Sequence, residues 1–194
     1  MSKPKARTIV ALLAALLVVA VAYVAVIVVV AQRASEPEPE ITAYAHGKAV
    51  TVRPFMFCDP KVANSQIDLN DCDTSESISN LDVPSGTPLQ ISLPKEIANA
   101  PWRMKLWYRI PGDNVAVGAF SYDDYKKGLV NTEVKSDGTP YAITVPTPKD
   151  PQITLAVAEL YLPVPAMDAA GNVGWVPSAI WSIHTPAYQG LEIQ

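Results

Sequence analysis

Cysteine, histidine and glycine are scarce in this chain, and their scarcity removes several classes of enzyme. Of 194 residues, two are histidines and two are cysteines, and no serine lies within a Gly-x-Ser-x-Gly sequence, so the nucleophile turn of α/β-hydrolases is missing. No glycine-rich phosphate-binding motif occurs. The cysteines do not form Cys-x-x-Cys, and no further Cys or His nearby completes a metal site. The sequence therefore predicts a protein that is not an enzyme and that holds no cofactor or metal.

One long segment, from Thr8 to Ala31, lacks charge, glycine and proline altogether. A helix of that length covers roughly 36 Å, more than a hydrocarbon core of about 30 Å. Basic residues occupy three of the first seven positions, which predicts that residues 1–7 stay in the cytoplasm. We therefore expect a transmembrane helix over residues 8–31 of a single-pass plasma-membrane protein, with the rest of the chain extracytoplasmic.

A cleaved signal peptide is the alternative reading of this segment. Its apolar region would span about 7 to 15 residues and end at a small-x-small cleavage site. Here the apolar run is longer, and a cut after Ala34 would place Gln32 at the −3 position. Because that site is poor, the sequence favours a retained anchor.

Acidic residues are absent before position 35, and the charge balance changes sign beyond it. After position 34 there are 19 acidic and 11 basic residues, a net charge of −8. A domain of that sign is not expected to bind nucleic acid or an anionic membrane surface through its net charge. Its length of about 160 residues suits one domain with a real core.

Cys58 and Cys72 both lie in the part expected outside the membrane, where disulfides form. We expect them to pair, which would stabilise the fold by about 3 kcal/mol. The acidic run from Asp68 to Glu76 also raises a calcium loop as an alternative. It has Cys72 at a ligand position and no glycine for the sharp turn, so a solvated loop pinned by the disulfide is the preferred reading.

Proline and glutamate alternate in residues 32–40, which predicts an extended stalk. Short apolar runs separated by turn residues then follow to residue 188, and no helical period persists for three turns. They predict an all-β extracytoplasmic domain at 41–188, an immunoglobulin-like β-sandwich of about seven to nine strands. We expect residues 189–194 to form a flexible tail and His46-Gly47 to form a hairpin turn.

Alternation along the predicted strands identifies the core, because successive strand residues point to opposite faces. The residues expected to be buried are Leu89, Ile91, Leu93, Trp102, Met104, Leu106, Tyr108, Ile143, Val145, Leu155, Val157, Trp181 and Ile183.

The opposite face of the strand at 102–110 carries a local basic stripe, formed by Arg103, Lys105, Trp107 and Arg109. Cations packed over a solvated Trp are one explanation. The other is a partner-binding surface, because Trp and Arg are common interface anchors. The loop 122–127 is a second candidate of the same kind, through Tyr122 and Tyr125.

Two phrases carry a family resemblance, PLQISLPKEIANAPWRMKLWYRIP from Pro88 to Pro111 and GWVPSAIWSIHTP from Gly174 to Pro186. With the N-terminal span, they make the chain similar to the DUF2771 family of actinobacterial envelope proteins. The resemblance implies an envelope location and supplies no active site. Some members of that family carry a lipid on a Cys, whereas this chain has the apolar span instead.

These features predict a non-catalytic accessory or scaffold subunit whose outer domain docks on a larger integral-membrane complex. In size and topology the chain is similar to single-span accessory proteins of the actinobacterial cytochrome bc1–aa3 respiratory supercomplex, which makes that complex a candidate partner. The alternative is a ligand- or lipid-binding module in cell-envelope biogenesis, which predicts an apolar pocket between the sheets.

Overall fold

A computed structural model describes residues 6–33, 38–59, 61–63, 66–69, 72–75, 77–112, 114–167 and 173–191. The chain divides into two compact units, Met1–Pro37 and Glu38–Gln194.

The first unit contains the helix α1 (Ala6–Arg33), which includes the whole of the predicted apolar segment. Its stretch Leu13–Ala31 has a mean hydropathy of 3.2, and the side chains of that stretch are exposed within the structure. Such a helix has the length and composition of a membrane anchor or of a signal sequence.

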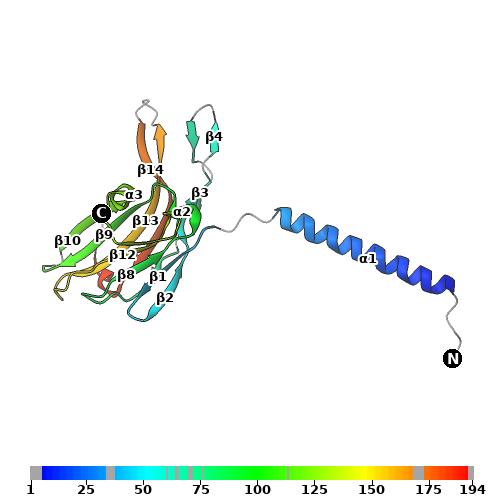
Figure 1. The fold of residues 1–194 in the computed structure, drawn as a ribbon, viewed down its shortest axis with the longest axis horizontal. Helices are drawn as coiled ribbons and strands as arrows, with labels where there is room; N and C mark the ends of the chain where they lie inside the picture. The colour runs from blue at the N-terminus through cyan, green and yellow to red at the C-terminus, as the bar shows by residue number, and fades with distance from the viewer. Residues whose placement is uncertain are drawn as a thin grey trace. The chain divides into compact units, whose positions relative to one another are not determined.

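The second unit is a β-sandwich of two sheets, which confirms the predicted fold class (Figure 1). The first sheet has the order β11 (Thr132–Val134), β12 (Pro140–Val145), β8 (Leu89–Ser92), β1 (Ile41–Ala45) and β2 (Lys48–Val52). The second has the order β10 (Asn114–Ser121), β9 (Arg103–Ile110), β13 (Thr154–Met167), β14 (Val173–His184), β3 (Pro54–Cys58) and β6 (Cys72–Thr74), and β7 (Ser79–Asn80) pairs with β14.

The strand order is that of an immunoglobulin sandwich. Strands β1, β8, β12 and β11 occupy the places of A, B, E and D, while β10, β9, β13 and β14 occupy those of C′, C, F and G. Their pairings within each sheet are antiparallel. The two sheets hold more strands than the seven to nine expected. The additional strands are β3, where no strand was predicted, and β6 and β7, which lie in the polar segment from Cys58 to Asp82 that was predicted to be a loop. In the same segment, β4 (Lys61–Ala63) and β5 (Gln66–Asp68) form a separate pair.

The core between the sheets follows the predicted alternation. All thirteen predicted core residues are buried except Tyr108, which is half-buried and packs against the core. Trp102 and Trp181 are the bulkiest fully buried side chains. One core residue, Val157, belongs to a smaller cluster away from the main core, which also contains Trp107 and Leu191.

Two local predictions are confirmed. His46 and Gly47 both have positive φ values, 47° and 76°, at the turn between β1 and β2, as tight hairpin turns require. Cys58 and Cys72 form a disulfide between directly opposed residues of β3 and β6.

The two ends of the domain differ from expectation. Pro39 and Glu40, predicted to be stalk, contact the domain: the Pro39 carbonyl accepts a hydrogen bond from Trp181 Nε1 at 2.9 Å, and Glu40 pairs with Arg53 at 2.9 Å. The stalk prediction is also wrong for Gln32 and Arg33, which are the last residues of α1. Glu38 is the first residue of the second unit, and residues 34–37 lie outside the described residues. The predicted tail is wrong for residues 189–191, because Leu191 is buried after the short helix η1 (Pro186–Tyr188); residues 192–194 are not described.

Strands β13 and β14 are longer than predicted. The sequence pattern predicts strands over Ile153–Leu162 and Trp175–His184, but the observed strands continue pairing to Met167 and from Val173. The register shifts between Leu162 and Pro163, and from there the paired strands project as a hairpin beyond the sandwich (Figure 1). We call the part beyond Leu162 the extended hairpin.

Candidate functional site

The predicted basic stripe lies on the outer face of β9, as alternation required. There Arg103 is opposite Tyr161, Lys105 is opposite Glu159, and Trp107 is opposite Val157 of β13. Directly opposed residues of antiparallel strands share a face, so these side chains form rows across the second sheet. The structure divides the stripe into a covered half and an open half.

Trp107 and Arg109 form the covered half, and the expectation that Trp107 lies on a solvated face is wrong. Its exposed fraction is 5%, because the C-terminal segment packs over it through Leu191. Arg109 Nη2 donates a hydrogen bond to the Gln189 carbonyl at 3.1 Å, which fastens the same segment. This half of the stripe stabilises the fold, and Trp107 is not available to a partner.

Lys105 stands between the two halves. Its Nζ lies 4.5 Å from the centre of the Trp107 ring, a cation–π contact. Beside it, burial raises the pKa of Glu159, while the Lys105 charge and the Ser182 hydroxyl oppose that shift. Lys105 thus has partners within the domain.

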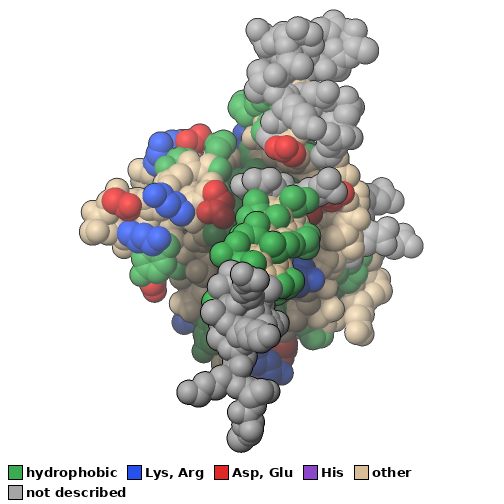
Figure 2. Space-filling view, turned by 90° about the vertical axis from the view of Figure 1, so that its right-hand side faces the viewer, with side chains coloured by type: hydrophobic (Ala, Val, Ile, Leu, Met, Phe, Trp, Pro, Cys, Tyr) green, Lys and Arg blue, Asp and Glu red, His purple; other side chains and the backbone are tan. Residues whose placement is uncertain are grey.

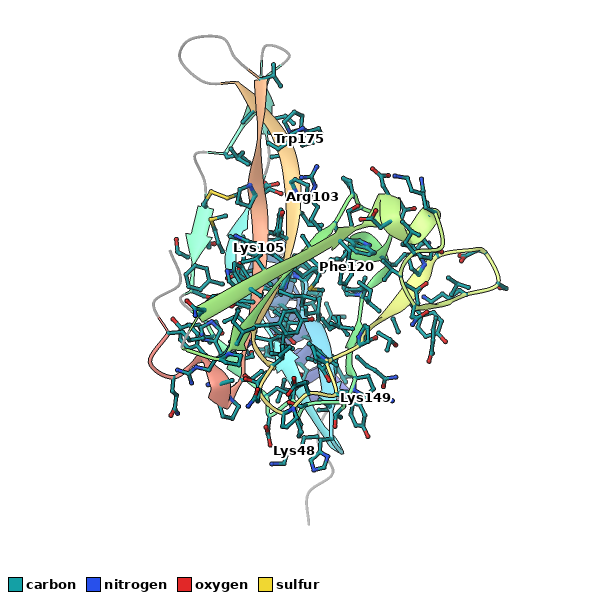
Figure 3. The ribbon with its side chains drawn as sticks, turned by 90° about the vertical axis from the view of Figure 1, so that its left-hand side faces the viewer. Lys48, Arg103, Lys105, Phe120, Lys149 and Trp175 are labelled. Atoms are coloured by element: carbon teal, nitrogen blue, oxygen red, sulfur yellow. A yellow bond between two sulfur atoms is a disulfide. The ribbon has the colours of Figure 1, made fainter. Side chains whose placement is uncertain are left out.

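Arg103 forms the open half, at the base of the extended hairpin. Its guanidinium lies 6.0 Å from the centre of the Trp175 ring, and 62% of Trp175 is exposed. Figure 3 shows the two side chains together at this end, with Lys48 and Lys149 at the opposite end of the domain. They border a half-open cleft of about 330 Å³, which we call the hairpin-base cleft. Its other walls include Trp102, Phe120, Tyr122 and Tyr161.

The helix α3 (Tyr122–Lys126) forms one wall of this cleft, and its first turn explains why. Ser121 and Asp124 make a reciprocal capping box, in which Asp124 Oδ2 accepts from the Ser121 backbone N–H and hydroxyl, each at 2.8 Å. These bonds hold the pKa of the Asp124 carboxyl below its ordinary value. They start the helix directly after β10 and place Tyr122 against Trp102, with ring centres 6.0 Å apart.

Tyr122 and Tyr125, predicted to contact a partner, are half-buried and engaged inside the domain. Their rings lie 5.7 Å apart, and Lys126 Nζ lies 4.7 Å from the centre of the Tyr122 ring. The Tyr125 hydroxyl donates to the Gly138 carbonyl at 2.7 Å. Of the two, Tyr122 lines the hairpin-base cleft, whereas Tyr125 holds a neighbouring turn.

A second cleft, of about 280 Å³, opens between the two sheets. We call it the sandwich-edge cleft. Its walls are mainly apolar and come from β9, β10, the end of β12 and the loop before β11; among them are Leu106, Tyr108, Gly118, Phe120, Leu129 and Val145. The alternative of a ligand- or lipid-binding module predicts an apolar pocket between the sheets, and this cleft lies between them at the margin of the core.

Sequence reasoning missed Trp175 as a surface residue. The composition of the two strands explains why, since residues 160–167 and 173–183 contain no charged side chain. Such runs are read as buried strands, and only the length of the hairpin takes Trp175 beyond the sandwich and into solvent.

The clefts contain groups that suit binding. Aromatic rings, one guanidinium and the α3 carboxylates surround the hairpin-base cleft, while Glu159 and His184 are not among the residues lining either cleft. Within the ranges described, no three metal-binding side chains come together. On the face that Figure 2 presents, basic and acidic side chains are interspersed, without a broad area of one sign.

Comparison with known proteins places the chain in a family. An uncharacterized protein of Mycobacterium tuberculosis is 32% identical over 148 residues, covering 75% of this chain and 76% of the relative. An uncharacterized protein of Mycobacterium bovis matches equally well. No solved structure matches. Residues 34–186, most of the β-sandwich, match the family described as "Protein of unknown function (DUF2771)". The chain therefore belongs to the DUF2771 family.

Proposed function

We propose that the protein is a non-catalytic accessory subunit, anchored by α1, whose extracytoplasmic domain docks on a larger integral-membrane complex. The observation that carries this proposal is the exposed Trp175, with the Arg103 guanidinium 6.0 Å from its ring centre, at the rim of the hairpin-base cleft. Aromatic and Arg side chains beside a concave surface are the usual anchors of protein interfaces. Trp175 replaces Trp107 as the aromatic residue of the predicted surface.

Three features support the membrane setting. The apolar stretch of α1 is long enough to span a bilayer, and basic residues precede it. The Cys58–Cys72 disulfide suits an oxidising compartment. Only a short stretch separates α1 from β1 (Ile41–Ala45), so a retained anchor would hold the domain near the membrane.

The specific partner that we propose is a respiratory complex of the cytochrome bc1–aa3 type, on the basis of size and topology. Purification of the full-length protein from its own membrane in mild detergent tests it. Stoichiometric cytochrome subunits with haem absorption would support this identity. Co-purifying cell-wall or lipid-export proteins without haem would replace it with another partner, and a protein that purifies alone would contradict docking.

Variants test the surface itself. Arg103→Ala with Trp175→Ala should lower recovery of the partner at least tenfold, because both anchors are lost. Lys48→Ala with Lys149→Ala, at the opposite end of the domain, is the matched control and should leave recovery unchanged (Figure 3). Equal recovery with both double variants would show that docking uses another surface.

The sandwich-edge cleft favours a second candidate function, a ligand-binding module in envelope biogenesis. Its apolar walls suit an aliphatic group, but about 280 Å³ lies just below the usual range of roughly 300–1,000 Å³ for ligand pockets. It would hold part of one chain rather than a whole lipid. Mass spectrometry of organic extracts from the purified protein tests this function. A lipid present in stoichiometric amount would favour ligand binding over docking.

A further inference from the structure

Strand β10 (Asn114–Ser121) forms one edge of the second sheet and lacks the features that usually protect an edge. It has eight residues without charge or proline, and its register with β9 is regular throughout. The other edge strands are shorter: β2 carries Lys48, β6 carries Asp73, and β11 carries Glu133 beside a register shift. Charges, bulges and short length are the devices that keep sheet edges from pairing, and β10 has none of them.

The backbone of β10 is bonded on one side only. It pairs with β9, and in the described part of the chain no other strand pairs with it. Alternate N–H and C=O groups of an edge strand point away from its neighbour, so the outer side of β10 presents a row of backbone donors and acceptors. Val117, near the middle of the strand, is 56% exposed.

Both clefts described above flank this edge. Ala119 and Phe120 line the hairpin-base cleft and the sandwich-edge cleft alike. Gly118 and Phe120 share the inner face with Leu106 and Met104, whereas Ala119 and Ser121 share the outer face with Lys105 and Arg103. A strand added beside β10 would therefore direct alternate side chains to the inner and the outer face, each next to a cleft.

We propose that β10 binds an extended segment of a partner protein by strand addition. In this mode, backbone hydrogen bonds supply affinity and the pockets select alternate side chains. The sandwich-edge cleft selects a large aliphatic or aromatic side chain on the inner face. The hairpin-base cleft selects an outer-face side chain that accepts a hydrogen bond from Arg103. This inference rests on the proposed docking function and specifies its partner as an uncharged, alternating strand.

The size of the sandwich-edge cleft distinguishes a partner segment from a second copy of this chain. If β10 paired antiparallel with its own copy about Gly118, Ala116 would lie opposite Phe120. A methyl group leaves most of a cleft of about 280 Å³ empty. A Leu, Ile or Phe side chain from another segment fills it better, so we assign the edge to a partner rather than to self-association.

A defined peptide tests the edge without the native partner. The probe is Lys-Thr-Leu-Thr-Leu-Thr-Leu-Thr-Leu-Lys, titrated against the full-length protein in nanodiscs, with hydrogen exchange followed by mass spectrometry. The control peptide has Pro in place of the two central Thr residues, which removes strand hydrogen bonds at equal charge. We expect the probe to slow amide exchange at least tenfold within residues 114–121 and the proline peptide to leave it unchanged.

Matched variants test the site. Val117→Lys places a charge on the exposed edge and should weaken probe binding at least tenfold, whereas Thr51→Lys, exposed on the edge strand β2, should not. Absence of binding at millimolar peptide, or protection confined to another strand, would overturn the inference. A dimer with β10 protected before peptide is added would assign the edge to a second copy instead. Because this assay needs no native complex, its failure is distinguishable from failure of the protein to co-purify with a membrane complex.

Discussion

At the residue scale, Trp107 was predicted to be the exposed Trp of the basic stripe, but the exposed Trp beside Arg103 is Trp175. Trp107 alternates with cations and looks like a surface residue, yet it is covered by Leu191. Trp175 lies in an uncharged run that gives no sign of an exposed position, yet it is exposed to solvent beside Arg103. One of these tryptophans should therefore matter for folding and the other for docking.

Replacing Trp107 tests the first role. Trp107→Ala should lower the free energy of unfolding by about 3–5 kcal/mol, because it leaves a cavity beneath the C-terminal segment. Trp175→Ala, the matched control, should change it by less than about 0.5 kcal/mol, since most of that ring is exposed. Urea unfolding of the full-length protein in detergent measures both, and equal losses would contradict the assignment.

His184 gives a prediction about pH. His184 is buried, and its ring centre lies 4.0 Å from that of Tyr188. Burial lowers the pKa of His184 below its ordinary value of 6.5. The folded protein thus resists protonation of this ring more than the unfolded chain does. Its contribution to stability is present above pH 6.5 and is lost as the pH falls below that value. Between pH 7.5 and pH 5, the midpoint temperature of thermal unfolding should fall less steeply for His184→Gln than for the native protein. Identical slopes would show that another group causes the pH dependence.

At the scale of elements, the segment after β3 depends on a covalent link. The short strand β6 pairs with β3 at the edge of the second sheet, and the disulfide joins their opposed residues Cys58 and Cys72. Three paired residues contribute little cooperative stability, whereas closing a loop of 14 residues restrains the unfolded chain.

Removing this link should be measurable. Cys58→Ala with Cys72→Ala should lower the free energy of unfolding by about 3 kcal/mol, through loss of loop-closure entropy. Urea unfolding of the native protein with and without reductant provides the parallel measurement, and the reduced protein should unfold like the double variant. A variant as stable as the oxidised protein would show that the link does not contribute.

At the scale of the whole molecule, the two units have separate tasks in our proposal, one of anchoring and one of docking. The fate of α1 decides between an anchored and a released domain. A retained anchor confines the domain and its partners to one membrane, which raises their effective concentration.

Intact-mass analysis of the native protein tests the anchor. We expect a mass that includes residues 1–31 and a protein that stays with the membrane through alkaline carbonate washing. Protease added to spheroplasts should digest the sandwich if it lies outside. A soluble protein whose mass corresponds to a chain that starts near residue 35 would identify α1 as a cleaved signal sequence.

Much of the fold was predictable because it depends on local pattern. Alternation at Leu89, Ile91 and Leu93 identified a half-buried strand, and His46-Gly47 identified a hairpin turn, since both follow from backbone geometry over a few residues. The short strands after Cys58 were missed, because polar runs of three residues carry no periodic signal. The capped helix α3 was missed for a similar reason, as it covers little more than one turn.

The sequence by itself determined the apolar helix, the pairing of the two cysteines and the face on which each β9 side chain lies. The tertiary structure decided which of those side chains remain open. Arg109 meets Gln189 across 80 residues, and Arg103 meets Trp175 across a similar span. Strand periodicity determines the side of a sheet to which a residue points, but the segment that covers that side arrives from elsewhere in the chain. The docking surface that we propose therefore forms only when the C-terminal segment and the extended hairpin are in place.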